Sequence, residues 1–433
     1  MLFVSTRGTE RVPLSTAITQ GLAADGGLFV PVEWPAAAAH TVGGSEALPM
    51  VAQQFLEPFA HGDALAPHLG AIATEAFNFP APLLPLRAEA RLSVLELFHG
   101  PTAAFKDFGA RFLAAALTRL RAGAARPLRI LVATSGDTGG AVAAAFHRRA
   151  RVQVAVLFPK GLVSPTQQQQ LTCWGDNVQS LAVRGSFDDC QALVKQAFLD
   201  PALRAEFELS SANSINLGRL LPQAVYYLAT SLAVKRQTGE STSFVIPSGN
   251  LGNSTACVWA RRLGAPIGEI VLAHNANRTV PDYLSEGVLR MRASVPTLAS
   301  AMDVGSPSNL ERLSALYPDA VSLGAAVSAV SVDDNAIRAR IRADHDRYGE
   351  IWCPHTATAA EAWARLPASR REHGPWVLVA TAHPAKFREI VEPLIGRPLP
   401  VPVNLARLFE LPAQFSEIDP TLAALRARLK EAA

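Results

Sequence analysis

Residues 128–158 read LRILVATSGDTGGAVAAAFHRRARVQVAVLF and carry the clearest fold signal in the chain. The short apolar run at the start predicts a buried strand over Leu128–Ala133. A polar loop with glycine follows at 134–139, after which a helix is predicted over 141–150 and a second strand over 152–158. Strand, loop, helix and strand in this order predict a parallel βαβ unit.

Two further stretches repeat this order of elements. The first has a predicted strand at Phe244–Pro247, a loop at 248–253, a helix through Arg262 and a strand at Ile270–Ala273. The second has a predicted strand at Trp376–Ala380, a loop at 381–384 and a helix through about Val391. Ligands of open parallel sheets bind beyond the carboxyl ends of the strands, so we expect the three polar loops to line one crevice.

The composition is that of an ordinary globular protein. The 433 residues are 49% hydrophobic and 18% charged, and the net charge of +3 is too small to indicate a nucleic-acid binder. The four cysteines have no zinc-type spacing and are expected to be buried, reduced thiols. The N-terminus does not resemble a signal peptide and no apolar run reaches about 18 residues, so we expect a cytoplasmic protein without a membrane span.

Prolines divide the chain at two places. Three prolines between positions 80 and 85 predict a linker over 80–92, which separates an N-terminal domain over 1–79 from an α/β region over 93–433. Three more prolines near the C-terminus exclude a regular helix, so residues 396–404 are expected to lie extended over the surface.

The loop at 248–253 reads SGNLGN and precedes a predicted helix. Glycine lets the backbone approach a ligand closely, and a helix N-terminus presents unpaired N–H groups. This combination predicts a phosphate site built from backbone donors, although a plain strand-to-helix turn has the same composition. The spacing matches neither the dinucleotide fingerprint nor the P-loop, which disfavours a nucleotide-binding module.

Residues 98–112 read FHGPTAAFKDFGARF, which predicts a polar turn followed by an amphipathic helix. Lys106 lies at the start of this helix, between Phe105 and Phe108. The helix dipole and desolvation both disfavour the ammonium, so we expect a lowered pKa for Lys106. A neutral amine is what imine formation requires, so Lys106 is the first candidate for a catalytic residue. The alternative is a surface lysine beside Asp107.

The segment around Lys106 resembles the signature of the threonine synthase family, and similar motifs extend over nearly the whole chain. They are Gln20–Ala23 and Asp25–Pro31, Ser135–Gly139, Asn213–Asn216 with Arg219–Gln223, Ala301–Val304 with Pro307–Asn309, and Thr381–Phe387. Together with these motifs, the Lys106 segment is highly specific for the family, whereas the glycine loops alone are not.

The resemblance implies a fold type II enzyme that depends on pyridoxal 5′-phosphate (PLP), with two parallel-sheet α/β lobes, the cofactor in the cleft and a small N-terminal domain. The implied reaction is the last step of threonine biosynthesis, in which O-phospho-L-homoserine and water give L-threonine and phosphate by β,γ-elimination and hydration. Lys106 would hold PLP as a Schiff base and act as the base at the α and β carbons. The other implied cofactor-binding residues are Asp137, Gly249, Asn250, Leu251, Gly252, Asn253 and, at the pyridine nitrogen, Thr381.

The substrate brings a second phosphate, which needs donors of its own. Arg219 suits this phosphate because a guanidinium forms bidentate, charge-assisted hydrogen bonds. The companions that the resemblance implies are Ser135, Thr138, Asn213, Ser214 and Asn216. Without the family, the stretch 213–216 is equally typical of a helix cap with a turn.

Asp137 stands where many enzymes of this type have Asn, near the phenolic oxygen of the cofactor. Either Asp137 shares a proton with that oxygen, or it turns away to bind backbone amides. Lys386 is a weaker candidate than Lys106 for the imine lysine. Three histidines are interpreted as packing or outer-layer residues, because Lys106 can perform the proton transfers: His99, His355 and His383.

Two alternative functions remain open on the sequence alone. A serine or threonine dehydratase of the same fold would share the cofactor site but would not require a second phosphate site. A relative that binds PLP or a phosphorylated ligand without this turnover is disfavoured by the intact Lys106 and Arg219. The sequence indicates neither a metal site nor a protein partner.

Overall fold

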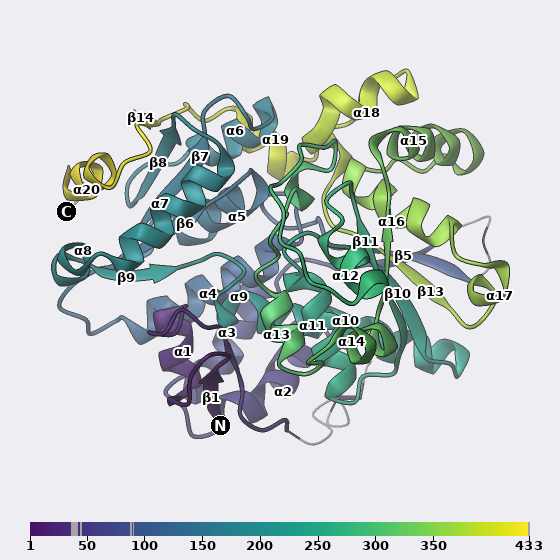
Figure 1. Ribbon diagram of the computed structural model, residues 1–433, viewed down its shortest axis with the longest axis horizontal. Coiled ribbons are helices and arrows are strands. Elements are labelled where there is room, and N and C mark those ends of the chain that lie inside the picture. Colours follow the sequence, from purple (N-terminus) through teal and green to yellow (C-terminus); the bar gives the residue numbers. More distant parts are fainter. Residues whose placement is uncertain (36–41, 44–45, 87–88, 90, 432–433) are drawn as a thin grey trace.

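The computed structural model describes residues 1–35, 42–43, 46–86, 89 and 91–431. Two lobes are each built on a largely parallel sheet, and the N-terminal part packs against both (Figure 1). In this view the smaller lobe lies at the upper left and the larger lobe at the right (Figure 1).

The small lobe contains a five-stranded parallel sheet in the order β14-β8-β7-β6-β9. The strands are β6 (Leu128–Ala133), β7 (Val152–Pro159), β8 (Val178–Val183), β9 (Glu208–Ser211) and β14 (Ser416–Ile418). The helices are α5 (Asp137–Phe146), α6 (Pro165–Thr172), α7 (Phe187–Leu199), α8 (Pro201–Glu206) and α20 (Leu422–Glu431). The predicted strand β6 is confirmed to the residue. Helix α5 begins earlier than predicted because Gly136, with a φ of 141°, turns the chain directly into it.

The large lobe contains a six-stranded sheet in the order β12-β11-β10-β13-β5-β4. The strands are β4 (Leu83–Pro85), β5 (Leu92–Glu96), β10 (Thr242–Pro247), β11 (Ile267–His274), β12 (Ser328–Ser331) and β13 (Trp376–Ala380). Five of them run parallel, and β4 pairs antiparallel with β5 at the edge. The predicted strands within β10, β11 and β13 are confirmed. Strand β4 lies inside the segment predicted as a linker, at a sheet edge where proline is tolerated.

Helices cover both faces of the large sheet, so its inner strands β10 and β13 are buried on both sides. Val377 and Val379 of β13 join the core that includes α10 and α11, whereas Leu378 and Ala380 join the core that includes α16. The helices of this lobe and of the region between the lobes are α4 (Lys106–Leu120), α9 (Leu217–Leu220), α10 (Ala224–Thr238), α11 (Gly252–Arg262), α12 (Thr279–Glu286), α13 (Leu310–Ser314), α14 (Ala320–Ala326), α15 (Asp334–Tyr348), α16 (Pro354–Ala364), α17 (Ala368–Arg371), α18 (Arg388–Ile395) and α19 (Val403–Phe409). Short 3-10 helices are η2 (Ala66–His68), η3 (Leu221–Gln223), η4 (Ser300–Met302) and η5 (Pro384–Phe387).

The N-terminal part consists of a three-stranded antiparallel sheet in the order β2-β1-β3 and three helices. Its elements are β1 (Leu2–Ser5), β2 (Arg11–Pro13), α1 (Leu14–Gln20), β3 (Phe29–Pro31), α2 (Leu48–Ala60) and α3 (Leu69–Ala76). Helix α3 packs against α4, and their buried side chains belong to one continuous core. The N-terminal part is therefore packed onto the helix that carries Lys106.

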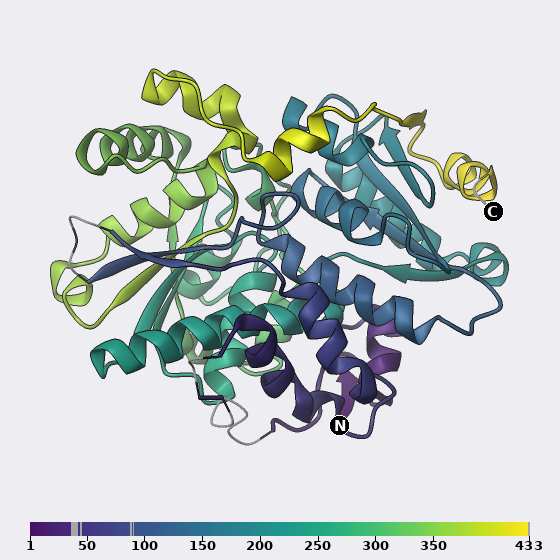
Figure 2. The ribbon, with the colours of Figure 1, turned by 180° about the vertical axis from the view of Figure 1, so that it is seen from behind.

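The C-terminal segment crosses from the large lobe to the small lobe, which Figure 2 shows in yellow. Residues 397–402 contain no regular element, in agreement with the proline pattern, and α19 begins directly after Pro402. Farther on, β14 pairs in parallel with β8 of the small lobe.

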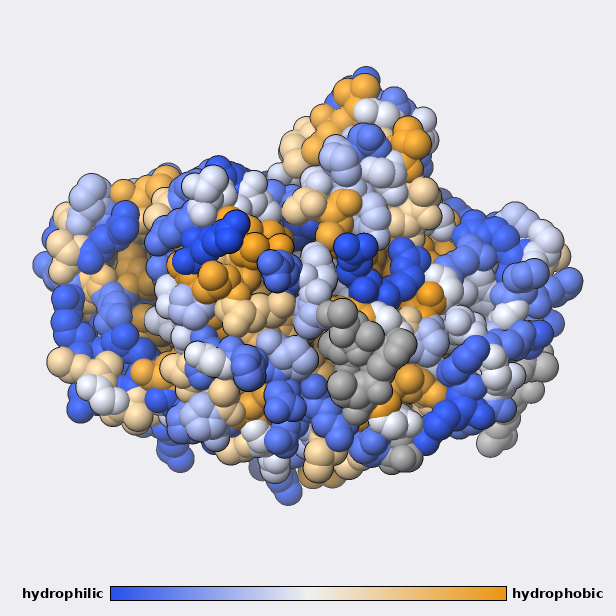
Figure 3. All heavy atoms as spheres, turned by 90° about the horizontal axis from the view of Figure 1, so that it is seen from below, coloured by the Kyte–Doolittle hydropathy of each residue, from blue (hydrophilic) through white to orange (hydrophobic). Residues whose placement is uncertain are grey.

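The surface seen from below carries small apolar groups among hydrophilic ones, and a protrusion rises on one side (Figure 3). Scattered apolar groups of this kind are normal for a folded protein. No helix of the described residues combines the length and the apolarity that crossing a bilayer requires.

Candidate active site

A cavity lies between the two lobes, where β6, β10 and β13 end. It contains about 960 Å³ of empty space, part of which is open to solvent. All three polar loops contribute to its wall, which confirms that they converge. The residues predicted for the site that line the cavity are Lys106, Ser135, Asp137, Thr138, Asn213, Ser214, Arg219, Gly249, Asn250, Leu251, Gly252, Asn253 and Thr381. Asn216 is not among the lining residues.

Lys106 is the first residue of α4 and is half-buried in the cavity wall. Its Nζ lies 5.9 Å from the centroid of the Phe105 ring. Burial lowers the pKa of this amine to about 8; Asp137 opposes the shift, and the charges of Arg219 and Lys386 add to it. An amine with this pKa is neutral in roughly a tenth of molecules at pH 7, far more than an ordinary lysine, and imine formation requires the neutral form.

Hydrogen bonds on both sides hold the backbone that presents Lys106. The N–H of Phe105 donates to the carbonyl of Thr381 over 2.9 Å, which ties this loop to the end of β13. Asp107 is buried and accepts from the N–H of Thr102 at 2.8 Å and from its hydroxyl at 2.7 Å. The position of Lys106 is thereby fixed relative to the large sheet.

The glycine loop enters α11 through Leu251, which has a left-handed φ of 62°. A Cβ at Gly249 would lie 2.7 Å from the Cα of Met302, so only glycine fits at this close approach of two backbones. Helix α11 begins without a side-chain cap, and its first turn lines the cavity. Its first amide groups are therefore available to an anion.

Asn253, in the first turn of α11, supplies a side-chain donor as well. Its Oδ1 accepts from the hydroxyls of Tyr226 and Tyr227, which fixes the orientation of the amide. Its Nδ2 is buried and has no hydrogen-bond partner among the described residues. A buried donor without a partner is costly, so this amide fits a site that an anion completes.

Arg219 lies in α9 and is only 2% exposed. One Nη donates to the carbonyl of Ala212, whereas the buried Nε has no partner. Burial lowers the pKa of the guanidinium to about 10, which Asp107 opposes, so Arg219 still carries a charge at neutral pH. Within the described parts of the chain Arg219 forms no ion pair, and a buried cation of this kind suits a phosphate.

The segment 213–216 divides into residues at the cavity and a residue behind it. Asn213 donates from Nδ2 to the carbonyl of Ala133 at 2.8 Å and so holds the end of β6. Asn216 is fully buried, caps α9 by accepting from the N–H of Gly218 at 2.8 Å, and donates to the carbonyl of Ile18. For Asn216 the helix-cap interpretation is confirmed, and its side chain supports the segment 213–216 from behind the cavity.

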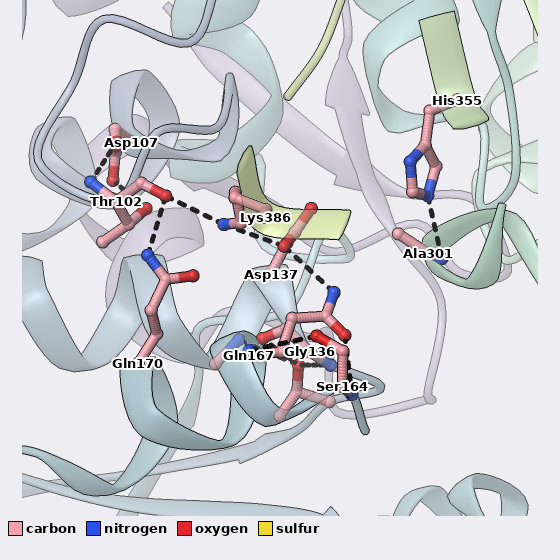
Figure 4. Close-up of polar contacts among 12 residues, drawn as sticks. Thr102, Asp107, Gly136, Asp137, Ser164, Gln167, Gln170, Ala301, His355 and Lys386 are labelled. Carbon is pink, nitrogen blue, oxygen red and sulfur yellow. Dashed lines mark hydrogen bonds and ion pairs between the residues drawn. The ribbon is translucent and has the colours of Figure 1, made fainter. Parts of the chain in front are cut away.

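Asp137 does not turn away to backbone amides, which was the second alternative considered from sequence; its carboxylate binds two side chains among the described residues. It forms an ion pair with the Nζ of Lys386 at 2.9 Å and accepts from the Nε2 of Gln167 at 3.2 Å (Figure 4). Burial opposes ionisation, but the charges of Lys386 and Lys106 outweigh it and hold the pKa of Asp137 well below its usual range. Sequence reasoning missed this pairing because nothing local to either residue indicates it.

His355, in the first turn of α16, was interpreted from sequence as a packing or outer-layer residue, and the structure places it in the cavity lining. Its Nε2 accepts from the N–H of Ala301 at 3.1 Å, so the proton resides on Nδ1 (Figure 4). That Nδ1 is buried and has no partner in the described part of the structure. Burial lowers the pKa of His355 to about 4. The charge of Asp137 opposes this shift, and the charges of Lys106 and Lys386 add to it. His355 is thus a neutral donor at the cavity wall.

The other two histidines of interest lie away from the cavity lining. His99 contacts Glu96 through Nε2 at 2.7 Å near the surface. His383 caps η5 by accepting from the N–H of Ala385 at 3.1 Å. Both agree with the interpretation as packing or outer-layer residues.

A buried arginine behind the cavity joins it to the N-terminal part. Arg312 donates to the carbonyl of Phe29 at 3.1 Å, to that of Ile215 at 2.6 Å and to Oδ1 of Asn309 at 2.6 Å. Asn309 in turn donates to the carbonyl of Asn250 at 3.0 Å. The glycine loop and the loop that begins at Asn213 therefore share one support, which sequence reasoning did not identify.

Three family models match the chain. The model "Threonine synthase N terminus" matches residues 2–77, "Pyridoxal-phosphate dependent enzyme" matches residues 75–382, and "Threonine synthase, C-terminal" matches residues 356–428. Threonine synthase from Haemophilus influenzae is 41% identical over 427 residues, which cover 97% of each chain. Threonine synthase from Escherichia coli is 38% identical over 419 residues, which cover 96% of each chain.

Solved structures extend the likeness to three dimensions. The crystal structure of threonine synthase from Escherichia coli has a TM-score of 0.91 at 36% identity and covers 100% of both chains. PLP-bound threonine synthase from Brucella melitensis has a TM-score of 0.91 at 33% identity and covers 100% of this chain and 99% of that one. The predicted type II fold is confirmed. The chain belongs to the threonine synthase family of PLP-dependent enzymes.

Proposed function

We propose that this enzyme converts O-phospho-L-homoserine and water to L-threonine and phosphate, with PLP bound in the cavity between the lobes. One observation carries the proposal. A single cavity combines a lysine of lowered pKa with two separate groups of anion donors, the first turn of α11 and the guanidinium of Arg219. The cofactor phosphate needs one of these groups, and a phosphorylated substrate accounts for the other.

The cavity residues fit PLP. Lys106 would bind the cofactor covalently, and residues 249–253 would hold its phosphate through backbone amides and the unpartnered Nδ2 of Asn253. Thr381 would offer the pyridine nitrogen a neutral hydroxyl. When bound, PLP serves as an electron sink for negative charge at the substrate carbons.

Lys106 is proposed as the group that moves protons. Its lowered pKa permits the amine to take a proton from the α carbon and to return one later in the reaction. The hydrogen bonds at Phe105 and Asp107 keep the start of α4 in place while the side chain moves.

Arg219 is proposed to hold the phosphate of the substrate, which leaves from the γ carbon. Its charge and its unpartnered Nε suit a departing dianion. Ser135, Thr138 and Ser214 add short polar side chains to the same cavity, while Asn213 keeps the end of β6 in position. A dehydratase acting on serine or threonine binds only the phosphate of the cofactor, so it would have no use for Arg219 as a second group of anion donors.

Phosphate release from O-phospho-L-homoserine tests the proposal. We expect the wild-type holoenzyme to release phosphate and form threonine, and Lys106→Ala to release none while retaining its fold by circular dichroism. If wild type loaded with PLP releases no phosphate but deaminates threonine, the dehydratase assignment replaces this one. Normal turnover by Lys106→Ala would refute the role of the lysine.

A further inference from the structure

A buried ion pair joins the two lobes beside the cavity. Lys386 lies on η5, which follows β13 of the large lobe, and Asp137 begins α5, which follows β6 of the small lobe. The Nζ of Lys386 lies 2.9 Å from Oδ1 of Asp137, and the two side chains are 0% and 5% exposed (Figure 4). The pair therefore lies where one inner strand of each sheet ends.

Neither charge has another ion partner at hydrogen-bond distance among the described residues. The Nζ of Lys386 also donates to the carbonyl of Thr102 at 2.8 Å, and Asp137 also accepts from Gln167 at 3.2 Å. Both of these additional partners are neutral. A buried charge is costly unless it is paired, so each member of this pair depends on the other.

The same group of residues reaches the backbone of Lys106. The carbonyl of Thr102 accepts from Lys386 and from the Nε2 of Gln170, which lies 2.9 Å away. The N–H and hydroxyl of Thr102 donate to Asp107, which directly follows Lys106. Lys386 thus anchors the loop that presents Lys106, in addition to its contact with Asp137.

The charges of the pair have opposite effects on the amine of Lys106. Asp137 raises its pKa and Lys386 lowers it, while Arg219 acts in the same direction as Lys386. The groups whose charges act on Asp137 are Lys386, Lys106 and His355. Asp137 lines the cavity, whereas Lys386 lies behind it with its Nζ engaged by two acceptors.

We propose that Lys386 and Asp137 act as one neutral unit, in which Lys386 is a positioning residue that holds the carboxylate at the cavity wall and keeps the two lobes aligned around Lys106. The unit leaves Asp137 able to accept a hydrogen bond from a bound ligand without adding net charge beside the reactive amine. The inference rests on the proposed role of Lys106 as the cofactor lysine.

Lys386→Met, Asp137→Asn and the double variant test the unit. We expect each single variant to lower the melting temperature by several degrees and to weaken PLP binding by at least about tenfold, because one buried charge loses its partner. The double variant should recover most of both losses. The measurements are thermal melting and fluorescence titration of the apo-protein with PLP.

A pH titration of the visible absorbance of bound PLP separates this role from simple packing. Lys386→Met removes a cation and leaves an anion, so the midpoint of the titration should rise relative to wild type. The double variant should return it toward the wild-type value. Lys160→Met, which breaks a surface ion pair with Glu417, is the matched control and should change none of these measurements.

Two results would overturn the proposal. One is a double variant that loses at least as much stability and PLP affinity as the two single variants together. The other is an unchanged midpoint in Lys386→Met. If Lys386→Met does not fold, the comparison of Asp137→Asn with the double variant decides, since the unit requires the double variant to be the more stable. No measurement uses O-phospho-L-homoserine, so the outcome is independent of the proposed reaction.

Discussion

Lys106 and Lys386 lie near the same cavity, yet their amines have different surroundings. The Nζ of Lys386 has two acceptors, whereas the Nζ of Lys106 has no hydrogen-bond acceptor in the described part of the chain and lies near an aromatic ring. An amine that must form a covalent bond has to be unengaged and partly neutral, so Lys106 suits the role and Lys386 does not. The aromatic neighbours of Lys106 predicted its environment from sequence, but the partners of Lys386 come from distant segments and could not be predicted.

Arg219→Met should separate the two phosphate sites. Methionine fills the buried position without a charge, so the substrate phosphate loses charge-assisted hydrogen bonds. We expect KM for O-phospho-L-homoserine to rise by about tenfold to a hundredfold, while the dissociation constant of PLP changes by less than about twofold. Steady-state kinetics and PLP titration of the same preparation check this. Equal losses in both would mean that Arg219 serves the cofactor phosphate.

At the scale of elements, the sequence predicted best those strands that are short, wholly apolar and followed by a polar loop. Strands β6 and β13 have the predicted bounds because both of their faces are covered by helices. Strand β4 was predicted as linker, because the prolines around it are also typical of an irregular segment. The short strand β14 carries no periodic signal, and it is a strand only because it pairs with β8, which lies far away in the sequence.

The glycine loop before α11 gives a test at this scale. In Gly249→Ala, the new Cβ would meet the backbone of Met302 at 2.7 Å, so the loop at 248–253 must shift away from Met302. We expect PLP to bind more weakly by at least about tenfold, because the amide donors move with the loop. Gly123→Ala is the control, since a Cβ there meets nothing within 4 Å. Unchanged PLP affinity in Gly249→Ala would remove this loop from the phosphate site.

Across the whole molecule, family motifs and loop positions predicted most of the cavity lining, but not Phe187, Gln191 or His355. They could not predict supports that join distant segments, such as Arg312, which reaches from α13 to the carbonyl of Phe29 in the N-terminal part. Asn216 was predicted to contact the substrate, and the structure places its side chain in the cap of α9, outside the cavity lining. A cap residue and a phosphate ligand can have the same polar side chain, so sequence does not separate the two roles. Which role applies depends on the direction of the side chain, and only the fold determines that.

Buried neutral histidines make the folded state sensitive to acid. Burial lowers the pKa of His274 to about 3 and that of His355 to about 4, from 6.5. At a pH below 6.5 but above the lowered pKa, each of these histidines binds a proton in the unfolded chain and none in the folded chain. The free energy of unfolding therefore decreases as the pH falls below about 6.5. His274→Leu should reduce the stability lost between about pH 7 and pH 5 by about 2 kcal/mol.

Urea unfolding of the holoenzyme at the two pH values measures this difference. His68→Leu replaces an exposed histidine and serves as the control, for which the pH dependence should equal that of wild type. An identical loss in wild type and His274→Leu would show that other groups govern acid sensitivity.

The crossing of the C-terminal segment has a consequence for biosynthesis. Four strands of the small-lobe sheet lie between residues 128 and 211, but the fifth, β14, is made only at residues 416–418. While the ribosome translates the intervening half of the chain, the outer edge of β8 stays unpaired. An open edge of this kind is a template for aggregation. The small lobe is therefore completed only after residues 416–418 have been made, and messages that end before them yield a chain with an exposed sheet edge.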